Sequence, residues 1–296
     1  MGAEPRQICE LPADIDFEQL SPLRRAVKRA LINPLANYLP AGLVRGLLRF
    51  GKSELAAANW ADPGGWQSMV ISYNGQCRQI ADKIMVSGGT MPMALRNRKR
   101  LGSYLIASLI ESVAAGGEAG EDEAAVHVLC LGAGPGQIII EALCRTLSPA
   151  KATLVDISSD AFEFGRALAA QRGLAERVAY IQADVRDLHE FLHEPPDIVK
   201  MLGICEYLSD EQIVTIASAA AEVMPFGSAI VFNSLSKAHG TDRFFRRAFG
   251  LHMIYRSPEE VTALMHRSGF GDFVLHREPL GVYHVIVGRR AGAAAD

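Results

Sequence analysis

The stretch Val128-Leu-Cys-Leu-Gly-Ala-Gly-Pro-Gly-Gln137 decides the fold, because an apolar run leads into three closely spaced glycines. Residues 126–131 predict a buried β-strand and residues 137–147 a helix. Glycines at 132, 134 and 136 permit the tight turn between them and let a ligand approach the backbone N–H groups that open the helix. A dinucleotide fingerprint needs G-x-G-x-x-G, and its last position is Gln137 here. The loop therefore favours a ligand without a pyrophosphate.

Downstream of this loop, short β-branched runs alternate with helical patterns. Strand–helix alternation with right-handed crossovers predicts an α/β fold with a doubly wound, mainly parallel sheet and helices on both faces. Only a Pro/Gly turn separates the last two strands, so we expect the final strand to be antiparallel. The seven predicted strands cover residues 126–131, 152–155, 178–181, 197–202, 229–235, 273–276 and 283–287.

Upstream, residues 22–115 show helical patterns with Pro and Gly breaks. Asn33-Pro34 predicts a helix stop, and residues 66–86 predict one further helix. Thr90 caps a predicted long helix that ends near Ala115. The Gly-rich, acidic run 115–125 is typical of a linker. We therefore expect two domains, a helical N-terminal lid over residues 1–115 and a ligand-binding domain over residues 126–290.

Acidic residues end the next two predicted strands. Asp156 ends the second strand, and Asp184 ends the third, directly before Val185. The carboxyl ends of parallel strands share one edge of the sheet, which is where open α/β folds bind ligands. Asp156 can accept both hydrogen bonds of a ribose diol. Asp184 can accept one from an adenine amine while the Val185 N–H serves a ring nitrogen, so the pattern predicts an adenosine site.

Residues 126–290 resemble the class I S-adenosylmethionine (SAM)-dependent methyltransferases in the motif LCLGAGPGQ, the acids of TLVDIS and IQADV, the segment DIVKMLGICEYL and the closing strand. The resemblance implies a seven-stranded Rossmann-like methyltransferase fold with an N-terminal helical cover, as in members that act on small molecules. It implies SAM as co-substrate or substrate. By it, Gly132, Gly134 and Gly136 pass under the methionine part of SAM, Asp156 holds the ribose and Asp184 the adenine.

The segment after the fourth strand is where this family places catalytic groups, and here it contains Gly203, Cys205, Glu206 and Tyr207. Gly203 lets the backbone approach the sulfonium, and Tyr207 offers a π-face for a cation. Glu206 is either a base whose pKa burial raises or a surface carboxylate. Cys205 is expected to be a packed small side chain. The Asn-Pro-Pro-aromatic tetrapeptide of enzymes that methylate nucleic-acid amino groups is absent, which argues against that substrate.

Three further features need an interpretation. Asn233, in the fifth strand, can point into the same cleft. Arg96, early in the long helix, either grips the SAM carboxylate bidentately or belongs to a solvated basic face. The sequence His189-Glu-Phe-Leu-His193 matches a zinc motif, but the predicted helix is short and no third ligand is evident, so no metal site is predicted.

Charge is unevenly distributed although the net charge is only −3. Residues 22–100 carry thirteen Lys and Arg against three acids, whereas residues 101–210 carry seven against seventeen. This favours a basic helical layer on an acidic body over a basic arm for nucleic acid or anionic lipid. No apolar stretch is long enough to span a bilayer, and five cysteines without a C-x-x-C pattern indicate reduced thiols in the cytoplasm. We therefore expect a small-molecule partner, no nucleic acid and no membrane partner.

Three functions remain open at this point. The leading one is transfer of the methyl group of SAM to a small-molecule acceptor. The second is intramolecular alkyl transfer, in which the amine of SAM attacks its own γ-carbon and yields azetidine-2-carboxylate and methylthioadenosine. The chain weakly resembles the bacterial azetidine-2-carboxylate synthases that do this. The third is a SAM-binding module without enzymatic activity.

Overall fold

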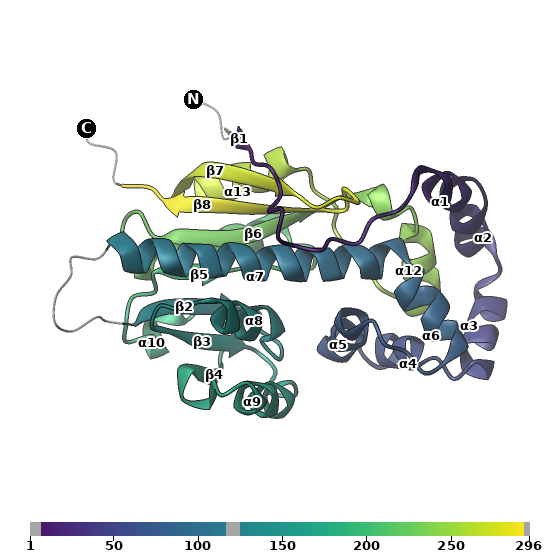
Figure 1. The fold of residues 1–296 in the computed structure, drawn as a ribbon, viewed down its shortest axis with the longest axis horizontal. Helices are drawn as coiled ribbons and strands as arrows, with labels where there is room; N and C mark the ends of the chain where they lie inside the picture. The colour runs from purple at the N-terminus through teal and green to yellow at the C-terminus, as the bar shows by residue number, and fades with distance from the viewer. Residues whose placement is uncertain (1–6, 117–124, 293–296) are drawn as a thin grey trace.

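The computed structural model describes residues 7–116 and 125–292 and is built around one mixed β-sheet (Figure 1). Its strand order is β1-β7-β8-β6-β5-β2-β3-β4, and β8 runs antiparallel to both of its neighbours. Strands β2 to β8 confirm the seven-stranded prediction; β1 adds a two-residue parallel edge beside β7. The strands are β1 Gln7–Ile8, β2 Val126–Leu131, β3 Ala150–Asp156, β4 Val178–Gln182, β5 Ile198–Lys200, β6 Ala229–Leu235, β7 Phe270–Arg277 and β8 Tyr283–Arg290.

Helices cover both faces of the sheet, as expected for a doubly wound fold. One apolar core joins the sheet to α7 (Thr90–Gly116), α8 (Gln137–Arg145) and α9 (Phe162–Gln171). The core on the other face includes α10 (Leu188–Phe191), α11 (Asp210–Val223) and α13 (Pro258–Arg267). Strand β2 is buried at every position, which explains why its sequence is apolar apart from His127, whose ring is hydrogen-bonded to Thr153 on β3.

Helix α7 confirms the long helix predicted from Thr90, and it crosses the sheet from end to end (Figure 1). Its residues Leu101, Leu105, Ile106, Leu109 and Ile110 recur at helical spacing and are buried in the same core as β2 and α8. The helix is therefore part of the body of the molecule. Residues 117–124 of the predicted linker lie outside the described residues.

The remaining helices lie beyond one end of the sheet (Figure 1). The prediction of a helix stop at Asn33-Pro34 is wrong: a π-helical turn over Lys28–Ile32 continues directly into the next helix, because Pro34 sits in its first turn. The prediction of one helix over residues 66–86 is also wrong, because Gly75 takes a left-handed conformation and ends the first piece. These helices are α1 Pro22–Val27, α2 Asn33–Tyr38, α3 Ala41–Phe50, α4 Glu54–Ala61, α5 Trp66–Asn74, α6 Ile80–Asp82 and α12 Asp242–Phe249.

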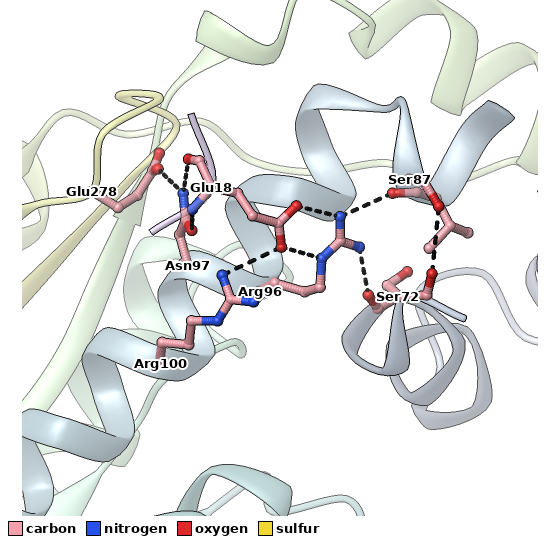
Figure 2. A network of polar contacts seen from close by, with 9 residues as sticks. Glu18, Ser72, Ser87, Arg96, Asn97, Arg100 and Glu278 are labelled. Carbon is pink, nitrogen blue, oxygen red and sulfur yellow. Dashed lines mark hydrogen bonds and ion pairs between the residues drawn. The ribbon is translucent and has the colours of Figure 1, made fainter. Parts of the chain in front are cut away.

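A buried polar network attaches the N-terminal segment to the body (Figure 2). The Asn97 side chain donates to the Glu18 carbonyl at 2.9 Å and to Glu278 Oε2 at 3.1 Å, and it accepts from the Glu18 N–H at 2.8 Å. Glu278 in turn accepts backbone N–H groups of the β7–β8 turn. These bonds leave the fully buried Asn97 satisfied. Among the described residues, no helix is long and apolar enough to cross a membrane.

Candidate active site

The glycine loop and Asp156 are joined directly. Gly132, Gly134 and Gly136 all have positive φ angles, of 60°, 51° and 75°, which other residues rarely adopt. The Gly134 N–H donates to Asp156 Oδ2 at 2.8 Å, and the Ser158 N–H donates to Oδ1 at 3.1 Å. The carboxylate at the end of β3 is thus fixed in orientation, while its remaining lone pairs stay free for a ligand.

The three glycines have different roles. A Cβ atom at Gly132 would lie 2.3 Å from Ile204 Cγ2, and one at Gly136 would lie 2.1 Å from Leu154 Cδ2. These two positions are glycine because the protein itself packs against them. A Cβ at Gly134 would meet only Trp66 Cβ, at 3.7 Å. Gly134 is therefore the glycine of the loop whose open side leaves room for a ligand.

A cavity of about 490 Å³ lies against this loop, within the size range of small-molecule sites. It brings together most of the predicted binding residues: Gly132, Gly134, Gly136, Asp156, Gly203 and Tyr207. Its remaining walls come from the α4–α5 connection and α5, from Arg98 on α7, and from Lys200 at the end of β5. The lining residues that the sequence analysis did not single out include Asp62, Trp66, Tyr73, Arg98 and Lys200.

A buried hydrogen-bonded chain lies behind the cavity wall. Arg98 Nη1 donates to Glu206 Oε1 at 2.8 Å, and the Asn233 side chain donates to Glu206 Oε2 at 3.2 Å. The Gly203 N–H donates to Asn233 Oδ1 at 2.7 Å, and Arg98 Nη2 donates to the Tyr73 hydroxyl at 2.9 Å. The fourth-strand loop, β6, α7 and α5 therefore meet in one network.

Within this network Glu206 pairs with Arg98. Its side chain is buried, both carboxylate oxygens have partners, and it is not among the residues lining the cavity. The prediction of a surface carboxylate is therefore wrong, because Glu206 counters a charge inside the protein. The position favours an orienting role for Glu206 over proton transfer to a bound substrate.

Arg98 and Lys200 put two buried cations at the cavity. The Arg98 guanidinium lies 4.5 Å from the centre of the Tyr283 ring, and its Nε has no hydrogen-bond partner among the described atoms. Lys200 is 4% exposed and contacts the Cys130 thiol, with no carboxylate partner among the described residues. The sequence contains a signal for this buried cation, because Lys200 stands inside the otherwise apolar run Ile198–Met201.

Tyr207 lines the cavity as predicted. Burial, with a contribution from the Glu206 carboxylate, raises the pKa of its phenol. The hydroxyl therefore stays protonated and can donate a hydrogen bond, while the ring remains available as a π-face. Cys205 is fully buried, donates to the Met201 carbonyl at 3.7 Å, and burial raises the pKa of its thiol to about 12, which suits the predicted packing role.

Arg96 does not reach the cavity. Its guanidinium pairs with Glu18 and donates to the carbonyls of Ser72, at 2.9 Å, and Val86, at 3.1 Å (Figure 2). Two residues further along α7, Arg98 lies on a different face of the helix and lines the cavity instead. Arg96 is thus a buried residue of the polar network, neither on a solvated face nor at the cavity, and Arg98 is the arginine of this run that lines the cavity.

Asp184 and Val185 lie in the loop after β4, outside the lining of the cavity. The Asp184 carboxylate accepts from the side chain of Arg186, and this pairing lowers its pKa. To accept a hydrogen bond from adenine it has to share or leave this partner, so the adenine role stays a prediction. Helix α10 ends at Phe191, before His193, and the described residues contain no group of three potential metal ligands.

Residues 128–227 match the family model of a methyltransferase domain. No curated protein sequence matches the chain. Among solved structures, a protein described as a possible exported protein from Bordetella parapertussis is similar at a TM-score of 0.67 and 15% identity, with coverage of 93% of this chain and 100% of that chain.

Two further solved structures are named methyltransferases. Magnesium protoporphyrin IX methyltransferase from Synechocystis PCC 6803, with bound S-adenosylhomocysteine (SAH), has a TM-score of 0.55 and 12% identity and covers 83% of this chain and 99% of that chain. An O-methyltransferase family protein from Burkholderia thailandensis has a TM-score of 0.51 and 15% identity, and the match covers 90% of this chain and 76% of that chain. At these identities the likeness shows the fold, and the family model adds the type of domain.

Proposed function

We propose that the chain is a class I SAM-dependent methyltransferase that transfers the methyl group of SAM to a small-molecule acceptor; the methyltransferase domain matched by residues 128–227 supports this. This proposal rests on one cavity that two parts of the chain line together. The glycine loop and Asp156 form one wall, and the helical N-terminal region forms another. A cavity of about 490 Å³ lined by Trp66 and Tyr73 suits a small acceptor better than a protein or nucleic-acid surface.

The adenosyl half of SAM fits the wall made by the glycine loop. Asp156 is held by two backbone N–H groups, so its orientation is set before a ribose diol binds. The open side of Gly134 leaves room for a ligand next to the loop. We expect Gly132 and Gly136 to support the loop from behind, through their packing on Ile204 and Leu154.

The carboxylate of SAM fits the two buried cations. Glu206 balances the charge of Arg98 but leaves its Nε without a partner, and Lys200 has no carboxylate partner among the described residues. A bound carboxylate would therefore accept from an open donor of Arg98 and offset the charge of Lys200. Glu206 and Asn233 hold this region in place: Glu206 fixes Arg98, and Asn233 fixes the Gly203 backbone. We assign both to positioning.

The acceptor end is formed by Tyr207, Tyr73 and Asp62. SAM supplies an electrophilic methyl group on a positively charged sulfur. The Tyr207 ring can face that charge, and the Asp62 carboxylate, at the end of α4, is available to accept a proton from the acceptor. The α4–α5 connection that carries Asp62 contains Gly64 in a left-handed conformation, so the sequence builds a turn at this entrance.

Incubation of the purified protein with methyl-labelled SAM tests the proposal. We expect almost no turnover with SAM alone, because the leading reaction needs an acceptor. Addition of the small molecules dialysed from an extract of the source organism's cells should produce SAH and labelled small molecules. The protein and nucleic-acid fraction of the same extract should remain unlabelled.

Two results would contradict this proposal. Label in the macromolecular fraction would show that the acceptor is not a small molecule. Release of methylthioadenosine from SAM alone, faster as pH rises through the pKa of the SAM amine, would show attack of that amine on its own γ-carbon. The enzyme would then be a cyclase.

A further inference from the structure

Exposed apolar side chains gather on helices α1 to α3, which we call the α1–α3 layer (residues 22–50). Nine of the seventeen large exposed hydrophobic residues of the described chain lie in this short segment. Phe50 is 88% exposed, Tyr38 is 68% exposed and Leu31 is 67% exposed. Such a concentration marks an interaction surface rather than ordinary surface scatter. The nine residues are Leu23, Val27, Leu31, Ile32, Leu35, Tyr38, Leu43, Leu47 and Phe50.

The same layer is strongly basic. Residues 22–50 contain six Lys and Arg and no Asp or Glu. Lys28 and Arg45 donate to backbone carbonyls and Arg49 lies over the Trp60 ring, so these contacts leave their positive charges uncompensated. None of the six has a carboxylate partner in the described chain. The layer therefore presents apolar groups and unpaired cations together.

The layer also borders an open cavity, which is lined in part by four of the nine exposed residues, Leu23, Val27, Ile32 and Leu47. A cavity of about 690 Å³ lies between α1–α3, residues 84–93 and α12, and nearly all of its lining is apolar. It shares no lining residue with the active-site cavity. The helices of the layer are short and are separated by a π-helical turn and by Pro40. An apolar group from outside can be accommodated beneath them.

The unpaired positive charges and the exposed apolar side chains of the layer together indicate which kind of partner it binds. A second copy placed symmetrically on this surface would bring the same unpaired cations together, which is unfavourable. Nucleic acid would match the charge but would leave leucine and isoleucine side chains unused, since such sites use stacking aromatic residues. The surface of an anionic bilayer satisfies both features, because apolar side chains enter the boundary between headgroups and acyl chains while Lys and Arg contact the headgroups.

We propose that the α1–α3 layer docks the enzyme onto the surface of an anionic lipid bilayer. This proposal differs from the expectation of no membrane partner, because the sequence shows these apolar residues without showing that they are exposed. The layer forms one end of the molecule, away from β4 and α9 (Figure 1). Docking therefore leaves the opposite end of the sheet in solution.

Vesicle co-sedimentation of the full chain tests the proposal. Vesicles of phosphatidylcholine alone are compared with vesicles that contain equal parts of phosphatidylcholine and phosphatidylglycerol. We expect binding to the anionic vesicles, with at least roughly tenfold weaker binding to the neutral ones, and loss of binding as salt is added.

Two sets of variants separate the apolar and the charged contributions. Leu31→Glu with Phe50→Glu should abolish binding; both residues are exposed and neither lines the cavity, so the fold should persist. Arg24→Gln, Arg25→Gln and Arg29→Gln together should weaken binding about 100-fold. The matched controls are Leu147→Glu, at a residue 99% exposed outside the layer, and Arg172→Gln with Arg267→Gln, both of which should bind as the parent does.

Equal binding to both vesicle types, or binding unchanged in Leu31→Glu with Phe50→Glu, would overturn the proposal. Light scattering without vesicles gives a further decisive outcome. If the protein does not bind anionic vesicles but forms a dimer, and Phe50→Glu dissociates that dimer, the layer is a self-association surface instead. SAM binding is measured in parallel on each variant and should not change, because the two cavities are separate.

Discussion

Arg98→Met should lower the free energy of unfolding by about 3–5 kcal/mol, the range seen when one partner of a buried ion pair is removed. Arg98 and Glu206 are 3% and 2% exposed and lie 2.8 Å apart. Removal of the guanidinium leaves Glu206 with only the Asn233 amide and takes away the partner of the Tyr73 hydroxyl. Denaturant unfolding at neutral pH measures the loss, and Lys151→Met, which breaks a solvent-exposed pair with Glu194, should change stability little.

The Arg98→Met and Glu206→Gln double variant tests the role of Glu206 more sharply. If Glu206 serves to hold Arg98, the double variant should lose much less stability than the sum of the two single variants, because each single change already breaks the pair. SAM binding should fall in both single variants. A Glu206→Gln variant with parental stability and parental SAM binding but no methyl transfer would instead assign Glu206 to proton transfer.

Gly134→Val should abolish SAM binding while the protein stays folded. A Cβ at this position meets only Trp66, so the valine side chain fills the space between the glycine loop and α5 that we assign to the ligand. The left-handed backbone, with φ of 51°, adds a cost of about 1–2 kcal/mol in the folded protein. Calorimetric titration with SAM and SAH measures binding, and circular dichroism reports the fold.

Gly173→Val is the matched control for this change. Gly173 has φ of 71°, and nothing lies within 4 Å of its added Cβ, so it carries a similar backbone strain away from any cavity. We expect Gly173→Val to lose stability as Gly134→Val does and to keep SAM binding. Equal loss of binding in both variants would show that strain, and not occupation of the ligand space, is responsible.

The sequence predicted those parts of the fold and site that depend on local chemistry. The strand–glycine–helix pattern placed the loop, and the carboxylate at the end of the next strand placed Asp156, because strand ends share one sheet edge. The apolar period of residues 90–115 gave α7. These features are predictable because they depend only on residues that are close in the chain or on the alignment of adjacent strands.

Other parts depend on contacts that no short pattern encodes. Both Arg96 and Arg98 belong to one basic run, and only the packing of α7 decides that Glu18 pairs with the first and that the cavity receives the second. Glu206 looks like a surface acid until Arg98 is placed 108 residues away in sequence. The exposure of the α1–α3 layer is likewise a property of the packed molecule, since the same leucines could have formed a core.

The most direct measurement of the central claim is the affinity of the full chain for SAH, with and without the Asp156 carboxylate. We predict that the parent binds SAM and SAH but not NAD, since the site offers a ribose acceptor and buried cations without a pyrophosphate fingerprint. Asp156→Ala should weaken SAH binding by about 1–3 kcal/mol, as expected for deleted charge-assisted hydrogen bonds, whereas Asp187→Ala, at an exposed acid outside the cavity, should bind normally. NAD binding tighter than SAM, or equal SAH affinity in Asp156→Ala and the parent, would contradict the account.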